Sequence, residues 1–390
     1  MSATAASWGI PRARYGLDGW LCGAIAVLLI WGLIMVASAS VAQAEKLTGD
    51  PFHFFYRQLL FMVLGGGIGF TMYCVPMEQW QRSSTWLYVF AIGLLIFVLI
   101  PGIGIKVNAA RRWIDLGLFR LQASEPARLA LIIYIASYIT RRQQQLQSGF
   151  KGLAMPLIAV MIPSLLLLME PDFGATAILM GVVFLMLFLG GARVLYYLAF
   201  VGFAAAGLMM IAVAAPYRVK RMLNFMDPWA DVENAGWQLA QSLIAVGRGE
   251  WTGVGLGNSV QKLLYLPEMH TDFIFAIMAE EFGLAGIALL ITLFGIVVWR
   301  GFTIARRAEM DGRRFQAYLC YGLTGWLGLQ SLINMAVNMG LLPTKGLTLP
   351  LLSYGGSSLL TVCAMLGLIL RVDYENRAAA FGVTSAEDRR

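Results

Sequence analysis

The sequence predicts an all-α integral membrane protein, with about ten transmembrane helices and a long external loop between the seventh and the eighth. Two observations predict this fold class. First, 59% of the 390 residues are hydrophobic and only 13% are charged, whereas a soluble domain carries roughly 25% charged residues. Second, apolar runs of about 20 residues, enough to span a ~30 Å hydrocarbon core, recur along nearly the whole chain. We therefore expect residues 1–390 to form a single polytopic membrane domain.

The first apolar run follows a short polar segment, residues 1–18, and covers residues 19–42. This run is too long for the apolar region of a cleavable signal peptide, so it predicts a retained helix. Two later apolar regions are divided at polar or glycine-rich breaks, Glu170-Pro171-Asp172 and Gly190–Arg193. The predicted spans are 19–42, 58–76, 84–101, 124–140, 153–169, 173–190, 194–215, 273–299, 315–341 and 357–372.

The basic residues between the spans predict the orientation. With ten spans both termini lie on one side, and most basic residues of the connections share that side: Arg82, Arg141, Arg142, Lys151, Arg193, Arg300, Arg306, Arg307, Arg313 and Arg314. The short connections on the other side hold only Lys46, Arg57 and Lys345. By the positive-inside rule, the tails 1–18 and 373–390 are both predicted to be cytoplasmic.

Two longer segments lie on the predicted external side. Residues 102–123 are rich in basic side chains, and residues 216–272 form a large periplasmic loop. Loops longer than about 15 residues are usually functional or disordered, and the tryptophans of this loop argue against disorder. Within it, Gly236–Arg248 has the pattern of an amphipathic helix that lies against the membrane face. The glycines of 253–257 predict a tight loop rather than a phosphate-binding loop, since no strand precedes them.

Ionisable groups at membrane depth are functional candidates, because a charge there costs ~2.5 kcal/mol or more. Asp272 ends the external loop and has two compatible interpretations. It can cap the eighth helix, or it can accept a proton or hold a metal at the outer interface. Glu280 and Glu281 lie two turns further along, and we expect them to pair within the bundle, with Arg128 as a candidate partner. The full set is Glu125, Arg128, Glu170, Asp172, Asp272, Glu280 and Glu281.

Two groups of basic residues lie on the predicted external side. One interpretation is simple solvation of the loops that carry them. The other is binding of phosphate or pyrophosphate, which suits the forked donors of Arg. Two such groups beside one carboxylate indicate a lipid-linked anionic substrate. The groups are Lys106, Arg111, Arg112 and Arg120, and Arg218, Lys220 and Arg221.

The segment before the last span, 349–358, combines a proline and two glycines with the hydroxyls of Ser353, Ser357 and Ser358. Broken backbone at membrane depth is tolerated beside protein or a wet cavity. The hydroxyls therefore either satisfy freed backbone groups or contact a substrate. Other chemistry is excluded by residue type: with only two histidines, the sequence has no Ser-His-Asp arrangement, no His/Cys metal spacing and no Walker motif. The four cysteines all lie in apolar runs, so no structural disulfide is expected.

Several segments resemble the SEDS family of membrane proteins, which includes FtsW, RodA and SpoVE. They extend over essentially the whole chain: Arg112–Ile114, Gln122–Ala130, Glu170–Thr176, Gly253–Lys262, Leu266–Phe273 and Lys345–Ser358. Within the family, Thr344–Pro350 and the early Gly49–Phe52 resemble the FtsW branch. The chain departs from the usual pattern at Ala123, where the family has Pro, and at Arg128, where it has Lys. Arg is not equivalent to Lys for proton transfer.

The resemblance implies the SEDS fold and a peptidoglycan glycosyltransferase that polymerises lipid II into β-1,4 glycan strands and releases undecaprenyl pyrophosphate. It also implies that Asp272 is essential. Our hypothesis is that Asp272 deprotonates the acceptor hydroxyl or holds a divalent cation, Mg²⁺ or Mn²⁺; no organic cofactor is expected. Lys106, Arg111 and Arg112 would stabilise the leaving pyrophosphate. Further substrate contacts are expected from Glu125, Arg128, Arg218, Lys345, Ser353 and Ser357.

Nothing in the chain could crosslink peptides, so the resemblance implies a partner that does. We expect the class B penicillin-binding protein FtsI, with other divisome membrane proteins such as FtsQ, FtsL and FtsB, at the division septum of the bacterial inner membrane. Two other functions stay open. Intramembrane charges and broken helices would also suit a lipid II flippase, and a non-catalytic divisome scaffold is the third interpretation. The external position of Asp272 and of both basic groups favours the enzyme.

Overall fold

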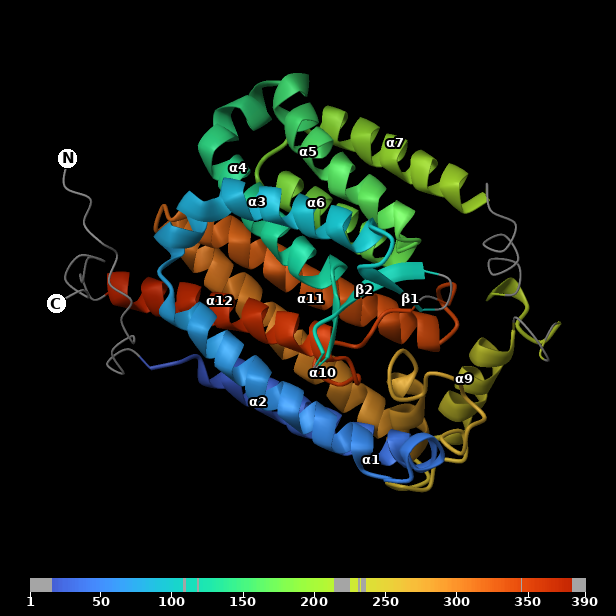
Figure 1. Ribbon diagram of the computed structural model, residues 1–390. Helices are drawn as coiled ribbons and strands as arrows, with labels where there is room; N and C mark the ends of the chain where they lie inside the picture. Colours follow the sequence, from blue (N-terminus) through green and yellow to red (C-terminus); the bar gives the residue numbers. More distant parts are fainter. Residues whose placement is uncertain are drawn as a thin grey trace.

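The computed structural model describes residues 16–107, 110–117, 119–213, 225–230, 232, 236–344 and 346–380. Within these residues the chain forms eleven helices and one small sheet (Figure 1). The helices are α1 (Gly19–Thr48), α2 (His53–Cys74), α3 (Met77–Leu99), α4 (Ser124–Ser148), α5 (Phe150–Met169), α6 (Phe173–Leu189), α7 (Val194–Val213), α9 (Trp237–Arg248), α10 (Ile274–Met310), α11 (Arg314–Asn338) and α12 (Gly356–Ala380).

A helix occupies each of the ten predicted spans. Most of these helices extend beyond the predicted span at one end or both. In the described part of the chain, six are long and apolar enough to cross a membrane by length and composition: α1, α2, α3, α5, α10 and α12. The helices α6 and α7 are apolar but contribute shorter stretches. The four cysteines are unbridged.

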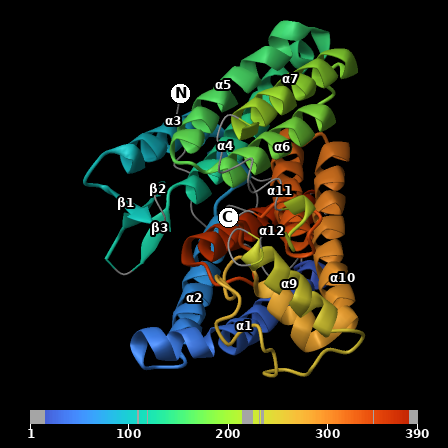
Figure 2. The same cartoon turned by 90° about the vertical axis from the view of Figure 1, so that its right-hand side faces the viewer.

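The helices α11 and α12 lie in the middle of the bundle, between the group α3–α7 and the group α1, α2 and α10 (Figure 2). Most of α4 up to Ile139 is buried as well. Because α4 and α11 face other helices, they can carry polar side chains that a lipid-facing helix could not. Those polar side chains explain why α4 and α11 are not among the helices that qualify as spans by hydropathy alone.

The basic segment 102–123, predicted only as an external segment, contains a three-stranded antiparallel sheet. Its strands are β1 (Gly104–Val107), β2 (Ala110–Asp115) and β3 (Arg120–Gln122), in the order β1-β2-β3. Ile114 of β2 is buried against Val98 at the end of α3 and Ala123 at the start of α4. This contact fixes the sheet on the ends of two helices, so its arginines are carried by ordered strands and not by an irregular loop.

The external loop contains the predicted amphipathic helix, α9, which packs on α10 and α11. The segment after it enters a break in α10 at Gly283, where φ is 62° and ψ is −159°. Two loop amides, those of Val254 and Gly255, donate to the carbonyls of Glu280 and Glu281 over 3.0 and 3.1 Å. The predicted tight glycine loop is confirmed, since Gly253, Gly255 and Gly257 all have positive φ. The loop therefore supplies hydrogen-bond donors to carbonyls of α10 at the break in this helix.

The last helix corrects one predicted boundary. Residues 373–380, assigned to a tail that begins at 373, continue α12, and the side chain of Asp373 is fully buried. Asp373 accepts a hydrogen bond from Arg377 over 2.9 Å, which keeps this turn within the bundle. Residues 1–15 and 381–390 lie outside the described residues.

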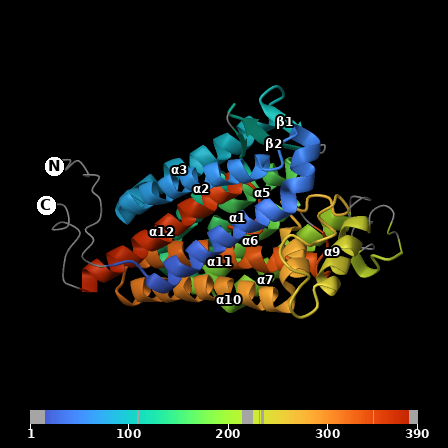
Figure 3. The ribbon, with the colours of Figure 1, turned by 90° about the horizontal axis from the view of Figure 1, so that it is seen from below.

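The sheet and α9 lie at one end of the bundle, and the last turns of α12 lie at the other (Figure 3). We call the first of these the sheet end. It also contains the α5–α6 connection, which Arg112 of β2 contacts, and the start of α12, which contacts β3.

Candidate functional site

Asp272 lies at the sheet end, two residues before α10 begins. The N-cap interpretation of Asp272 is wrong. The cap position of α10 is Phe273, and no side chain caps this helix. Within the described residues, no hydrogen bond to the Asp272 carboxylate is found, although its main-chain carbonyl accepts two, from Asn334 over 3.0 Å and from Asn338 over 3.1 Å. The backbone of Asp272 is thus fixed while its carboxylate stays available.

The surroundings of Asp272 change its acidity. Burial, followed by the carboxylate of Glu268, raises the pKa of Asp272 from 3.8 to about 7, while the charge of Arg112 acts in the opposite direction. Burial disfavours a charged carboxylate, and a like charge nearby disfavours it further. A group with a pKa near neutrality is suited to general acid–base chemistry.

Arg112 connects the sheet to the α5–α6 connection. Its Nε donates to the carbonyl of Glu170 over 2.9 Å, and its Nη2 donates to the carbonyl of Pro171 over 2.5 Å. Arg111 is paired across the sheet with Lys106. The register of the strands shifts between Ile105 and Lys106, which leaves Arg112 unpaired in a β-bulge, a feature that re-aims side chains. The structure therefore brings only Arg112 of this trio close enough to lower the pKa of Asp272.

The acidic residues of the α5–α6 connection have different environments. Asp172 caps α6 by accepting from the Ala175 amide over 3.0 Å, and it also accepts from Gln122 of β3 over 3.3 Å. Glu170 is fully buried, and neither of its carboxylate oxygens has a hydrogen-bond partner in the described part of the chain. Burial, with the charge of Asp172, raises the pKa of Glu170 to about 9. Glu170 is therefore a neutral acid at pH 7.

Glu125 and Arg128 form a buried ion pair in the first turn of α4. The guanidinium of Arg128 also lies over the ring of Trp326, 4.5 Å from its centroid. The expectation that Arg128 pairs with Glu280 or Glu281 is wrong, because the first turn of its own helix supplies a carboxylate at the i−3 position.

Glu280 and Glu281 instead fasten the external loop to α10. Glu280 accepts hydrogen bonds from Arg248 at the end of α9 and from Ser259 in the loop. Glu281 accepts from Lys262 over 3.1 Å and from Ser38 of α1 over 2.7 Å. Both glutamates are almost completely buried. Their pairing satisfies the requirement that a buried charge be paired, and it explains two carboxylates side by side in an apolar helix.

The serines before α12 satisfy freed backbone groups, as one of the two interpretations predicted. Ser353 accepts from the Leu349 amide over 2.8 Å. Ser357 accepts from the Gln122 amide over 2.9 Å and donates to the Arg120 carbonyl over 3.0 Å. Ser357 therefore attaches β3 to α12. Substrate contact by Ser353 and Ser357 stays a prediction.

Two predicted substrate-binding residues, Arg218 and Lys345, lie outside the described residues, as do Lys220 and Arg221. The neighbour of Lys345, Gly346, is described, and it lies directly beside Asp272. A Cβ atom at position 346 would lie 3.2 Å from Oδ2 of Asp272. The absence of a side chain on Gly346 thus leaves space next to the carboxylate.

Three buried amides of α11, those of Gln330, Asn334 and Asn338, belong to the site but have no place among the predicted residues. A signal for them exists in the sequence. They recur every fourth residue in an otherwise apolar span, which places them on one face of the helix. Unpaired buried amides are costly, so such a stripe indicates specific partners.

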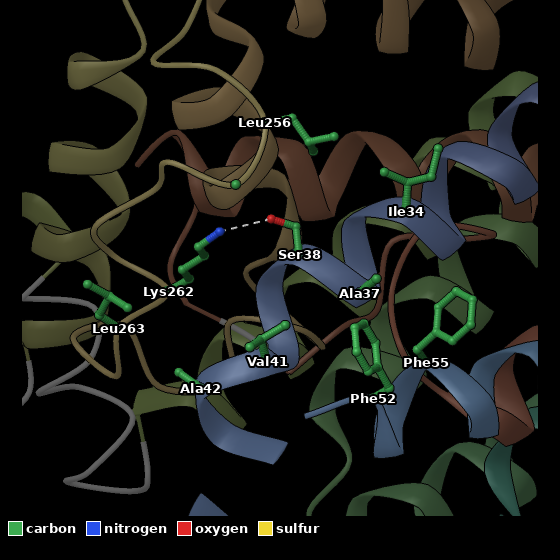
Figure 4. A pocket seen from close by; sticks show the side chains of 11 residues that line it. Ile34, Ala37, Ser38, Val41, Ala42, Phe52, Phe55, Leu256, Lys262 and Leu263 are labelled. Carbon is green, nitrogen blue, oxygen red and sulfur yellow. Dashed lines mark hydrogen bonds between the residues drawn. The ribbon is translucent and has the colours of Figure 1, made fainter. Parts of the chain in front are cut away.

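A groove of about 540 Å³ opens beside α1, the start of α2 and the external loop (Figure 4). Its walls are mainly apolar, and Lys262 points across it to Ser38, to which it donates over 3.1 Å. The lining residues are Ile34, Ala37, Ser38, Val41, Ala42, Phe52, Phe55, Leu256, Gly257, Lys262 and Leu263. None of the predicted site residues is among them.

No group of three or more His, Cys, Asp or Glu side chains that could hold a metal ion occurs in the described ranges. Mg²⁺ is commonly bound by one or two carboxylates together with substrate phosphates and water. The carboxylate of Asp272, which has no hydrogen-bond donor among the described residues, fits that shared mode of binding but does not form a cage made of protein alone.

Comparison with known proteins identifies the family. A family model described as "Cell cycle protein", for FtsW, RodA and SpoVE, matches residues 20–378. A relative from Thioalkalivibrio sulfidiphilus, named probable peptidoglycan glycosyltransferase FtsW, is 51% identical over 93% of this chain and 91% of its own length. A relative of the same name from Legionella pneumophila is 49% identical over 94% of this chain and 93% of its own length.

Solved structures agree with this fold. A chain from a structure described as "structural coordination of polymerization and crosslinking by a peptidoglycan synthase complex" matches with a TM-score of 0.76 and 28% identity, over 93% of this chain and 98% of that one. The rod shape determining protein RodA of Thermus thermophilus matches with a TM-score of 0.70 and 27% identity, over 94% and 99%. The family match over residues 20–378 and the extensive identity to the relatives show that this chain belongs to the FtsW/RodA/SpoVE family of cell cycle proteins.

Proposed function

We propose that this chain, a peptidoglycan glycosyltransferase of the inner membrane, polymerises lipid II at the sheet end with Asp272 as its catalytic carboxylate. One observation carries the assignment of the site. Asp272 has a backbone fixed by two hydrogen bonds and a carboxylate to which no described residue donates. A cap or a buried ion pair would engage the carboxylate, whereas a group that handles a substrate proton must leave it accessible.

In the reaction, the 4-hydroxyl of the acceptor GlcNAc attacks C1 of the donor MurNAc. The O4–C1 bond forms, the bond between C1 and the pyrophosphate oxygen breaks, and undecaprenyl pyrophosphate leaves. Asp272 takes the hydroxyl proton as general base and returns it to water. Its pKa of about 7 leaves a substantial fraction ionised at neutral pH while keeping the carboxylate basic enough to accept a proton.

The arginine of β2 suits the departing pyrophosphate. Arg112 is fixed by the carbonyls of Glu170 and Pro171, so its charge is in place before negative charge develops. Such preorganised charge is the main source of electrostatic catalysis. Lys106 and Arg111, paired with each other across β1 and β2, add positive charge to the same small sheet.

In the alternative role of Asp272, its carboxylate would hold a divalent cation, Mg²⁺ or Mn²⁺, whose charge would neutralise the leaving pyrophosphate. The carboxylate of Asp272, to which no described residue donates, supports this alternative. Asp272 would then act as a metal ligand instead of as the base.

The chain needs a crosslinking partner, since it polymerises glycan without joining peptides. That partner is a class B penicillin-binding protein of the FtsI type, with FtsQ, FtsL and FtsB as further divisome partners at the septum. The resemblance of the chain to a component of a peptidoglycan synthase complex supports the first of these. The distribution of basic residues supports an orientation with both termini in the cytoplasm, in which the sheet end and Asp272 lie on the outer side of the membrane.

An assay of glycan formation tests the proposal. The purified chain and its FtsI-type partner are incubated in detergent with labelled lipid II and a divalent cation. Wild type should give glycan ladders and Asp272→Asn none, with partner co-purification as the measure of folding. Ser331→Ala is a matched control, because Ser331 is buried on α11 but donates only within its own helix, to Leu327. Ladders from Asp272→Asn at the wild-type rate would remove Asp272 from the mechanism. No ladder from wild type beside an active control polymerase would favour the flippase or the scaffold.

A further inference from the structure

One face of α11 carries an amide stripe, defined as Gln330, Asn334 and Asn338. The three residues are spaced by four, so they follow one another along the same side of the helix. Each is at most 2% exposed. Helix α11 lies in the middle of the bundle, where a buried amide is tolerated only if it is hydrogen-bonded.

The partners of the stripe are two irregular segments at the sheet end. Asn334 Nδ2 donates to the carbonyl of Asp272 over 3.0 Å and to the carbonyl of Leu347 over 2.5 Å. Asn338 Nδ2 donates to the same carbonyl of Asp272 over 3.1 Å. Gln330 Nε2 donates to the carbonyl of Thr348 over 2.9 Å. All these acceptors are main-chain groups outside helices, so the stripe fixes backbone that secondary structure does not.

The two segments held by the stripe enclose the Asp272 carboxylate. Gly346 is one residue before Leu347, and a Cβ atom on Gly346 would lie 3.2 Å from Oδ2 of Asp272. Asn334 therefore holds the backbone that carries the carboxylate and the backbone that passes beside it. The amide of Asn334 links the two segments directly, while Asn338 and Gln330 each hold one of them.

The stripe also reaches the buried ion pair of α4. Trp326 lies one further step of four along α11, and its Nε1 donates to Oε1 of Gln330 over 2.7 Å. The guanidinium of Arg128 lies over the ring of Trp326. A continuous set of contacts thus leads from Arg128 through Trp326 and Gln330 to the segment beside Asp272.

We propose that Asn334 and Asn338, supported by Gln330, are positioning residues that set the distance between the Asp272 carboxylate and the 346–348 segment. The inference rests on the proposed catalytic role of Asp272. The amides act through main-chain carbonyls and touch no reacting atom. Their loss should slow turnover without weakening the capture of lipid II by the basic sheet.

The experiment compares Asn334→Leu, Asn338→Leu and the double variant with wild type and Ser331→Ala, each with its FtsI-type partner. Leu approximates the size of Asn but cannot donate. We expect kcat to fall about 10- to 100-fold in the double variant, the loss typical of a misplaced catalytic group, with KM and photo-crosslinking to lipid II within twofold of wild type. Each single variant should lose less, because the other amide still holds the Asp272 carbonyl, so the two losses should not be independent.

Three results would overturn the inference or its basis. An unchanged kcat in the double variant, with Asp272→Asn inactive, overturns the positioning role alone. Loss of lipid II crosslinking in parallel with kcat would mean that the amides serve substrate binding or the fold. Wild-type activity in Asp272→Asn would instead overturn the proposed function. If the double variant fails to co-purify with the partner, the single variant Asn334→Leu decides the matter, because it releases the Leu347 carbonyl while Asn338 still holds the Asp272 carbonyl. A lower kcat with unchanged crosslinking to lipid II then supports the positioning role, and an unchanged kcat overturns it.

Discussion

Lowering the pH from 8 to 6 should reduce the polymerisation rate about tenfold. The pKa of Asp272 is raised from 3.8 to about 7. If the ionised carboxylate is the base, about nine tenths of it is active at pH 8 and about one tenth at pH 6. The sign follows from the role: a base loses activity as it is protonated, so the rate rises with pH and levels off above neutrality.

The substitution Glu268→Gln should also move the midpoint of the pH–rate profile in a defined direction. The carboxylate of Glu268 raises the pKa of Asp272, so its removal should move the midpoint of the rate profile to lower pH. The initial rate of glycan formation from labelled lipid II, measured from pH 5.5 to 8.5 at saturating substrate, checks both effects. A profile that is flat or that falls with increasing pH would refute the reasoning, as would a midpoint in Glu268→Gln that moves to higher pH.

The same profile separates the two roles of Asp272. A metal ligand must be deprotonated, so cation and proton compete for the same oxygen atoms. If Asp272 holds the cation, a higher Mg²⁺ or Mn²⁺ concentration should shift the midpoint to lower pH. If Asp272 acts only as a base, the midpoint should stay in place while the maximal rate changes.

Three further substitutions test the packing around the site. Glu281→Ala should destabilise the chain by about 3 to 5 kcal/mol, since it leaves the nearly buried ammonium of Lys262 without its carboxylate; Glu281→Gln should lose less, and thermal unfolding in detergent measures both. In wild type, stability should decline by up to about 1.4 kcal/mol per pH unit, because the folded-state pKa of Glu170, about 9, exceeds its ordinary value of 4.5. Protonated Glu170 contributes its full share to the free energy of unfolding below pH 4.5, and this share is lost as the pH rises to about 9. The stability of Glu170→Gln should therefore decline less with pH than that of wild type, and an equal decline would contradict a buried neutral acid at this position. Gly346→Ala places a methyl group 3.2 Å from Oδ2 of Asp272 and should reduce turnover about tenfold or more without unfolding; an unchanged rate would mean that this space is not used.

The groups that handle charge could be predicted only in part. Residue type and a predicted position on the external side were enough to single out Asp272 and Arg112 as candidates. Their surroundings could not be predicted, because a pKa near 7 depends on burial and on Glu268 and Arg112, which tertiary contacts bring close to Asp272. The partner of Arg128 was wrongly predicted for a related reason. Hydropathy locates a buried charge but says nothing of which opposite charge faces it.

The small sheet is the element that the sequence did not indicate. Its strands are three to six residues long, and only Ala110 and Ile114 of β2 are buried. Such short segments give no clear alternation of apolar and polar residues. Their pairing becomes favourable because α3 and α4 offer a surface for Ile114.

The sequence by itself determined the fold class and the positions of ten helices in the bundle, because burial in lipid demands about 20 apolar residues wherever a helix crosses. That the charge chemistry is concentrated on one side of the membrane stays a prediction. Only the tertiary structure decided what each polar group does. It showed that Asp272 is no cap, that Glu280 and Glu281 hold the external loop, and that Asn334 and Asn338 hold the backbone of Asp272. Hydrogen bonds are short and directional, so their partners depend on distances between segments far apart in the chain, which no local pattern of residues contains.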